Sequence, residues 1–190
     1  MEIQRFKCSH CDEWHEGLPA LAYKTPEYYN ELSDIERKEI AKIGKDFCEI
    51  KYPNQVNRFI RVVLFQKVND FEGTLDYGLW VSLSEENFTD YWDNFNEDEH
   101  EAEYFGWLSS SIHGYEATTK IPVTVFVSKG NQRPEIVPHK DFKHQFVKDY
   151  YNGITYELAK RKVARLYSKD KPVKEKLSMF DKFEKWLNLN

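Results

Sequence analysis

The sequence predicts an α+β protein in which an antiparallel or mixed sheet is flanked by helices. Three segments rich in β-branched and aromatic residues are typical of strands, and they cover residues 58–65, 75–83 and 121–127. Other segments carry helix start signals followed by apolar residues at helical spacing. Hydrophobic residues make up 41% of the 190 residues, including 5 Trp, 12 Tyr and 13 Phe, so the chain can bury a substantial core.

The first third of the chain predicts one short strand and one helix. Residues 3–7 have the composition of a strand. Ser33 and Glu36 fit a capping box, in which each side chain accepts a hydrogen bond from the backbone N–H of the other residue. We expect the helix that they start to end at Gly44.

The segments after the strand at 75–83 alternate between helix and strand signals. Ser84 precedes two glutamates, which are favourable in the first turn of a helix, and we expect this helix to fray by Asn96. Residues 104–108 form an extended aromatic segment. Residues 142–151 have helical spacing, and Gly153 should end that helix.

The C-terminal region predicts two further helices. The first covers residues 155–167 and is basic, and the second covers residues 172–187 and carries an apolar stripe that must pack on something. We therefore divide the chain into a domain over residues 1–154 and a basic helical extension over residues 155–190, packed on that domain.

The cysteines suggest a zinc-knuckle-like turn near the N-terminus. Cys8 and Cys11 have the spacing that lets one turn present two sulfurs to an ion, and thiolates with an imidazole favour zinc in a tetrahedral site. Cys8, Cys11, His15 and Cys48 would complete a structural zinc site, with His10 as an alternative fourth ligand. The alternative interpretation is that Cys48 is an ordinary core thiol and that the other two cysteines lie in a half-buried turn.

Enzymatic alternatives for these cysteines are weaker. A thioredoxin-like role for Cys8 and Cys11 needs a βαβ context that the sequence lacks, and Cys48 as a nucleophile needs His139 or His144 beside it. The patterns of phosphate-binding loops, nucleophile elbows and zinc proteases are absent from the sequence.

Charge is unevenly distributed along the chain, whose formal net charge is -5. Between Lys67 and Lys120 there is no Lys or Arg, and the charged side chains there are acidic. This stretch is either a solvated face or a surface that docks a basic protein partner, with the candidate residues Glu97, Asp98, Glu99 and Glu101. The basic run 160–162 is too little to favour nucleic-acid binding in an acidic chain.

A second candidate site involves aromatic residues and arginines on the predicted strands. Arg61, Trp80, Trp107, Arg133 and His144 could surround a pocket in which an arginine binds a carboxylate or phosphate. The alternative is that the aromatic residues are core and that an acid, Asp46 or Asp76, pairs with the strand arginine.

Several strings in the sequence resemble a known family. The residues are those at 6–11, 59–61, 77–84, 104–108 and 153–154. Together, over about residues 6–154, they resemble the DUF2199 family of uncharacterised, mostly bacterial proteins. The resemblance implies a common fold and no particular activity.

These observations favour a non-enzymatic, zinc-binding interaction protein with an acidic partner-binding face, and an immunity-type protein would be one form of it. A small-molecule-binding protein or enzyme with a pocket around Arg61, Trp80, Trp107 and His144 is the alternative. The start of the sequence lacks the pattern of a signal peptide and no apolar run is long enough for a membrane span, so we expect a cytoplasmic location.

Overall fold

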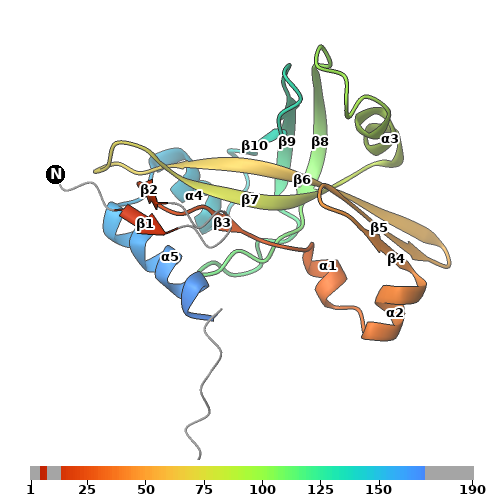
Figure 1. Ribbon diagram of the computed structural model, residues 1–190, viewed down its shortest axis with the longest axis horizontal. Coiled ribbons are helices and arrows are strands. Elements are labelled where there is room, and N and C mark those ends of the chain that lie inside the picture. The colour runs from red at the N-terminus through yellow and green to blue at the C-terminus, as the bar shows by residue number, and fades with distance from the viewer. Residues whose placement is uncertain (1–4, 8–13, 170–190) are drawn as a thin grey trace, which may run out of the picture.

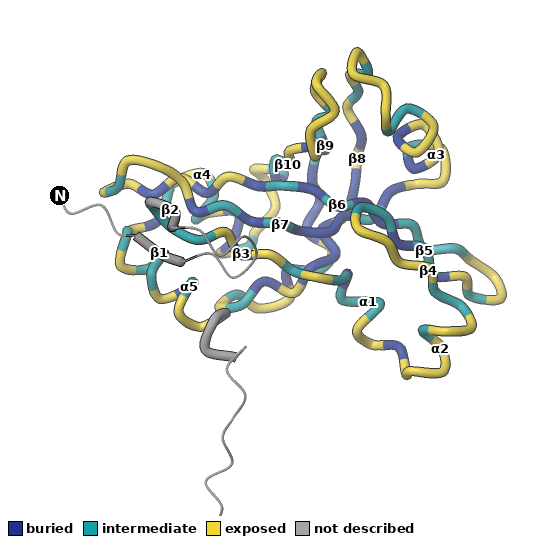
Figure 2. Tube along the Cα trace, viewed as in Figure 1, coloured by how far each residue is buried: buried dark blue, intermediate teal, exposed yellow. Residues whose placement is uncertain are grey.

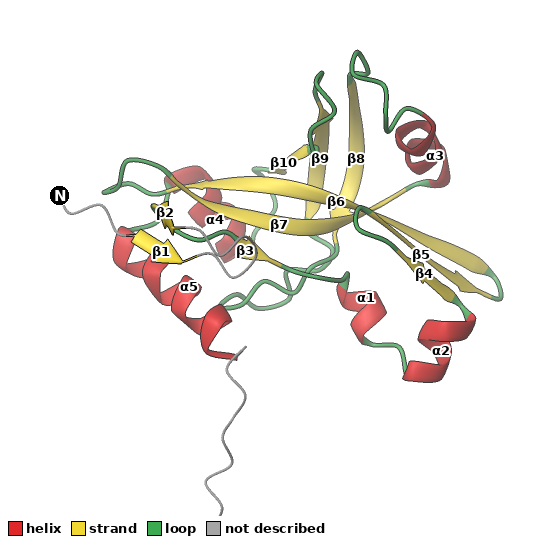
Figure 3. Cartoon of the chain, in the orientation of Figure 1, coloured by secondary structure: helices red, strands yellow, loops and turns green. Residues whose placement is uncertain are grey.

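The protein is a mixed α/β fold whose main sheet closes into a barrel, and the computed structural model describes residues 5–7 and 14–169 (Figure 1, Figure 3). The strands are β1 (Arg5–Lys7), β2 (Trp14–Glu16), β3 (Leu21–Ala22), β4 (Ala41–Ile43), β5 (Phe47–Tyr52), β6 (Gln55–Lys67), β7 (Thr74–Leu83), β8 (Ala102–Leu108), β9 (Pro122–Val127) and β10 (Glu135–Pro138). The helices are α1 (Glu27–Asn30), α2 (Asp34–Glu39), α3 (Glu85–Asp93), α4 (Gln145–Asn152) and α5 (Tyr156–Lys169). Within the described ranges, no helix has the length and apolar character that crossing a membrane would need.

Five strands form the barrel. The order in the main sheet is β3-β7-β8-β9-β10-β6-β5-β4, and β6 also pairs with β7 in the antiparallel direction. The ring closes where β10 runs parallel to β6, with Glu135 opposite Val63. The sheet is mixed because β3 also runs parallel to β7, and this agrees with the predicted antiparallel or mixed sheet. The closure into a barrel was not predicted.

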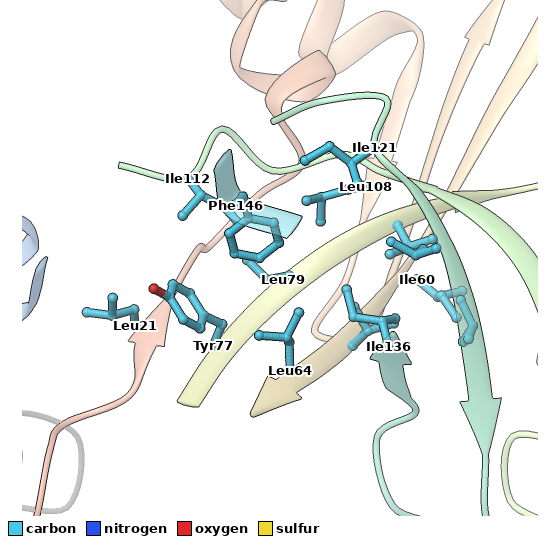
Figure 4. Close-up of a cluster of buried hydrophobic side chains, with 14 of the residues drawn as sticks. Leu21, Ile60, Leu64, Tyr77, Leu79, Leu108, Ile112, Ile121, Ile136 and Phe146 are labelled. Atoms are coloured by element: carbon cyan, nitrogen blue, oxygen red, sulfur yellow. The ribbon is translucent and has the colours of Figure 1, made fainter. Parts of the chain in front are cut away.

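Alternation along the strands separates the barrel interior from its outer face. In β6, Ile60, Val62 and Leu64 are fully buried, whereas Arg61 and Val63 between them are partly exposed. The buried set meets apolar residues of the other barrel strands and of α4, as the close-up shows (Figure 4). Ten residues of this core are labelled there: Leu21, Ile60, Leu64, Tyr77, Leu79, Leu108, Ile112, Ile121, Ile136 and Phe146.

A second, smaller core covers part of the outer face. Its buried strand residues are Cys48, Ile50, Phe59 and Trp80, and they pack with Leu32 from the segment between α1 and α2. Both faces of β6 are therefore covered at Phe59 and Ile60, which explains why these two consecutive residues are both buried.

The predicted strands are present, and β6 is longer than expected because it continues to Gln55 and to Lys67. The capping box at Ser33 is confirmed, but α2 ends at Glu39 rather than at Gly44. The reason is that residues 41–43 pair with β5 as β4, so the sheet takes over residues whose spacing suits a helix.

The other helix signals are confirmed with small shifts at the ends. Ser84 caps α3 through its side chain, and this helix ends at Asp93. α4 begins after His144 and ends before Gly153, whose φ of 78° suits glycine. The basic helix α5 runs to Lys169. The predicted turn at Cys8 and Cys11 and the predicted helix over residues 172–187 lie outside the described residues.

Candidate functional site

Cys48 is a core residue, and the described residues form no metal site that includes it. It lies in β5, is 1% exposed and packs in the smaller core. Burial raises the pKa of its thiol to about 12. His15 lies in β2, and Figure 1 shows β2 and β5 at opposite ends of the molecule, so the structure does not bring His15 and Cys48 together.

The remaining ligand candidates are near the N-terminus. Cys8, Cys11 and His10 lie outside the described residues. Among the residues that are described, no three His, Cys, Asp or Glu side chains form a group that could hold a metal ion. Zinc at Cys8, Cys11 and a histidine therefore stays a prediction, and the burial of Cys48 in the smaller core favours a fourth ligand near the N-terminus.

Arg61 is not paired with the acids expected from the sequence. Its guanidinium carbon lies 5.5 Å from the centroid of the Trp80 ring, and its buried Nε atom has no hydrogen-bond partner among the described residues. Asp46 instead accepts a hydrogen bond of 2.7 Å from Nε of Arg133, and Asp76 accepts one from Thr74. Burial and then the nearby Arg133 lower the pKa of Arg61, and Asp46 opposes them.

His144 has a structural role at the start of α4. Its Nδ1 atom accepts a hydrogen bond from the N–H of Phe146 at 3.0 Å, and Nε2 donates to the backbone carbonyl of Glu116 at 2.5 Å. Both ring nitrogens are therefore occupied. The structure brings Arg61 and Trp80 together, but His144 is held at the start of α4 by these two bonds and Trp107 lines a different groove with Phe59 and Ser82.

The predicted acidic residues gather at one end of the barrel. Glu97, Asp98, Glu99 and Glu101 are all exposed in the connection from α3 to β8, and we call them the acidic surface (Figure 2). Nζ of Lys129 lies 2.8 Å from a carboxylate oxygen of Glu99 and 3.9 Å from one of Glu101.

Hydrogen bonds fix the backbone beneath the acidic surface. The carbonyl of Asp98 accepts from the N–H of Gly130 at 2.8 Å, which ties the connection to the loop after β9. The Tyr104 hydroxyl donates to Asp90 of α3 at 2.6 Å and lies 3.1 Å from Nε2 of His100. Burial and the Asp90 carboxylate both raise the pKa of Tyr104, so this donor keeps its proton. The acidic side chains thus project from a connection anchored at both ends.

An exposed indole adjoins the acidic surface in the sequence. Trp92 of α3 is 54% exposed, and the centroid of its ring lies 4.5 Å from the centroid of the Phe47 ring. Trp92 was not predicted as a binding residue, although an aromatic residue in an otherwise acidic helix end was a visible signal.

A buried polar cluster was also missed. Lys162 of α5 is only 5% exposed, and its Nζ lies 3.5 Å from the centroid of the Tyr115 ring. The Tyr115 hydroxyl donates to Asp149 at 2.7 Å, and the hydroxyl of the buried Tyr77 and Oε1 of the buried Gln66 have no partner within the described part of the chain. The signal was the position of Lys162, three residues after the buried Ala159 on one helix face.

The fold and these surfaces define a small mixed α/β barrel protein with an acidic end and a partly open outer face. Comparison with family models identifies its relatives: the chain belongs to the family described as "Uncharacterized protein conserved in bacteria (DUF2199)", whose model matches residues 7–154. This agrees with the resemblance seen in the sequence, and α5 lies beyond the matched residues. No curated protein and no solved structure matched the chain.

Proposed function

We propose that the protein acts in the cytoplasm as a non-enzymatic binding protein whose acidic surface engages a basic region of a protein partner. The observation that carries this proposal is the density of exposed carboxylates. Glu97, Asp98, Glu99 and Glu101 supply four negative charges within five residues, and Lys129 is the one cation paired with them in the described structure. The local balance is therefore about three negative charges.

Electrostatics makes such a surface suited to partner capture. Isolated surface ion pairs contribute little to folding, so an anchored cluster of like charges has no evident stabilising role. A field of one sign raises the rate at which an oppositely charged partner finds its site and disfavours partners of the wrong charge. The exposed indole of Trp92 offers an apolar anchor of the kind enriched at interfaces. A protein that neutralises a cationic toxin is one concrete form of this proposal.

We also keep a structural zinc site at Cys8, Cys11 and either His15 or His10 as part of the proposal. Its role would be to hold the N-terminal segment, and partner binding does not depend on it.

Capture of partners by matched charge variants tests the proposal. The test variant carries Glu97→Gln, Asp98→Asn and Glu101→Gln, and the control carries Glu31→Gln, Glu39→Gln and Glu72→Gln, three exposed acids elsewhere. Both variants lose the same net charge, so a difference between them reports the location of the charge.

The immobilised proteins are exposed to lysate of their own organism at about 50 mM and about 500 mM salt, because screening shortens with ionic strength. We expect a partner that the wild type and the control capture at low salt, that the test variant binds about tenfold more weakly, and that high salt releases. A partner whose capture depends on neither the test substitutions nor salt would contradict the proposal.

A further inference from the structure

A groove on the outer face of the barrel has the size and lining of a small-molecule site. Its volume is about 390 Å³, within the range of about 300–1,000 Å³ typical of ligand pockets. The lining residues that matter here are Tyr28, Phe59, Ser82, Trp107 and Lys120. They come from α1, from three neighbouring strands and from the loop before β9, and the groove does not include the acidic surface.

The register of the sheet explains why a hollow forms there. Phe59 of β6 pairs with Ser82 of β7, and Ser82 pairs with Trp107 of β8. A small residue therefore lies between two aromatic residues on the same face of adjacent strands. Two strand spacings separate the outer pair by about 10 Å, which leaves room for a ring above the serine.

Aromatic side chains line this hollow: Trp107 is exposed, Tyr28 is partly exposed, and Phe59 is buried. Tyr28 stacks on Phe59 with ring centroids 5.7 Å apart and an interplanar angle of 25°. Trp107 is 44% exposed, although a large apolar side chain usually gains by being covered. Flat apolar walls favour a planar aromatic ligand, because offset or edge contacts between rings add to the gain from burial.

The charge of the groove comes from Lys120. The other cation of the lining, Arg58, is neutralised by Glu85, with Nη2 and the carboxylate oxygen 2.6 Å apart, and it also lies 3.8 Å from Glu49. For the Lys120 side chain, the described residues provide no ion pair or hydrogen bond, so its charge is available to a ligand.

The backbone of Lys120 is held in a costly conformation. Its φ is 71°, in the left-handed region that a lysine rarely adopts, and its N–H donates to the carbonyl of Leu108 at 2.8 Å. Leu108 directly follows Trp107, so this bond fixes the lysine beside the indole. Strained residues of this kind are concentrated at binding and catalytic sites.

We propose that this groove binds a small planar aromatic anion, with its ring between Trp107 and Tyr28, which stacks on the buried Phe59, and its acidic group on the ammonium of Lys120. The site differs from the pocket expected from the sequence, with which it shares Trp107 alone. It is also independent of the partner-binding proposal.

Three probes separate the parts of the recognition. Naphthoate carries both the ring and the charge, naphthalenemethanol lacks the charge, and cyclohexanecarboxylate lacks the aromatic ring. Calorimetry measures affinity, and the indole N–H resonance of Trp107, assigned with Trp107→Phe, reports the location. We expect saturable binding of naphthoate that shifts this resonance, and at least about threefold weaker binding of the other two probes.

Matched variants then test the residues. Lys120→Asn removes the charge while keeping a residue that tolerates the left-handed conformation, and Trp107→Ala removes one wall. Phe65→Ala is the control, because Phe65 is 41% exposed on β6, the strand of Phe59, and does not line the groove. We expect about threefold weaker naphthoate binding for Lys120→Asn, about fivefold for Trp107→Ala and no change for the control. Absence of naphthoate binding, or equal binding by all variants, would overturn the proposal.

Discussion

Replacing Lys162 by Met tests the cost of burying an ammonium group in this fold. Lys162 is 5% exposed, and its Nζ contacts the face of Tyr115 rather than an acid. Burial lowers the pKa of Lys162 from 10.5 to about 8, with attraction by Asp149 opposing the shift and repulsion by Arg165 adding to it. Met keeps a linear apolar side chain of similar reach and removes the charge.

The sign and size of the effect follow from the difference in pKa. Between pH 8 and pH 10.5 the unfolded chain binds the proton that the folded chain has released, so this group makes stability rise with pH in that window. Below about pH 8 both states are protonated and the full cost is present. Each pKa unit corresponds to about 1.36 kcal/mol, so the cost is about 3 kcal/mol at most. Lys162→Met removes this cost, but it also loses the cation–π contact with Tyr115, which offsets about 1 kcal/mol of the gain in stability.

Urea unfolding at two pH values measures this effect. We expect Lys162→Met to raise the free energy of unfolding by about 2 kcal/mol at pH 6.5, and to lose most of that advantage over the wild type by pH 10. Lys160→Met is the control, because Lys160 is a partly exposed neighbour on α5 that pairs with Glu157. A stability difference that is the same at both pH values would refute the reasoning, as would a Lys162 pKa above 10 in an NMR titration.

Three further predictions concern the core and the metal. Gly106→Ala should lower the free energy of unfolding by roughly 1–3 kcal/mol, because a Cβ there would lie 2.4 Å from Cγ1 of Val81, and Gly44→Ala, whose added Cβ would have no contact closer than 3.8 Å, is the control in urea unfolding. In the native protein Cys48 should resist thiol reagents at pH 8 and react once urea is added, since its thiol is buried and its pKa is raised to about 12; mass spectrometry of the labelled peptides checks this, and rapid native labelling of Cys48 would contradict it. Metal analysis should find about one zinc per chain that is lost in Cys8→Ser and kept in Cys48→Ala, whereas loss of zinc from the Cys48 variant would show that the core thiol is a ligand after all.

Local sequence patterns predicted most of the secondary structure because their causes are local. The capping box at Ser33 and the cap at Ser84 depend on residues three positions apart, and the β-branched runs of β6 and β7 depend on composition. The end of α2 was wrong because residues 41–43 gain more from pairing with β5 than from continuing a helix. Barrel closure depends on β10, a strand of four residues whose contact with β6 joins segments far apart in the sequence.

The sites show the same limit. The sequence placed the acidic residues in one stretch, and the structure keeps them together because they follow one another along the chain. It could not show that Asp46 pairs with Arg133 instead of Arg61, since that choice depends on where β5 and β10 meet β6. It also could not show that Ser82 lies between Phe59 and Trp107, because strand register decides it.

Strand β8 links the two proposed binding surfaces and also separates them. Glu101 immediately precedes this strand and Trp107 lies near its end, so at about 3.3 Å per residue the two are about 20 Å apart. That distance is more than two Debye lengths at physiological ionic strength, and charges on the acidic surface therefore act weakly on an anion at Lys120. A basic partner held at the acidic end would leave the aromatic groove accessible along the same strand. The two proposals can consequently fail independently. A Trp107 variant that no longer binds naphthoate should still capture the basic protein partner in a salt-dependent way.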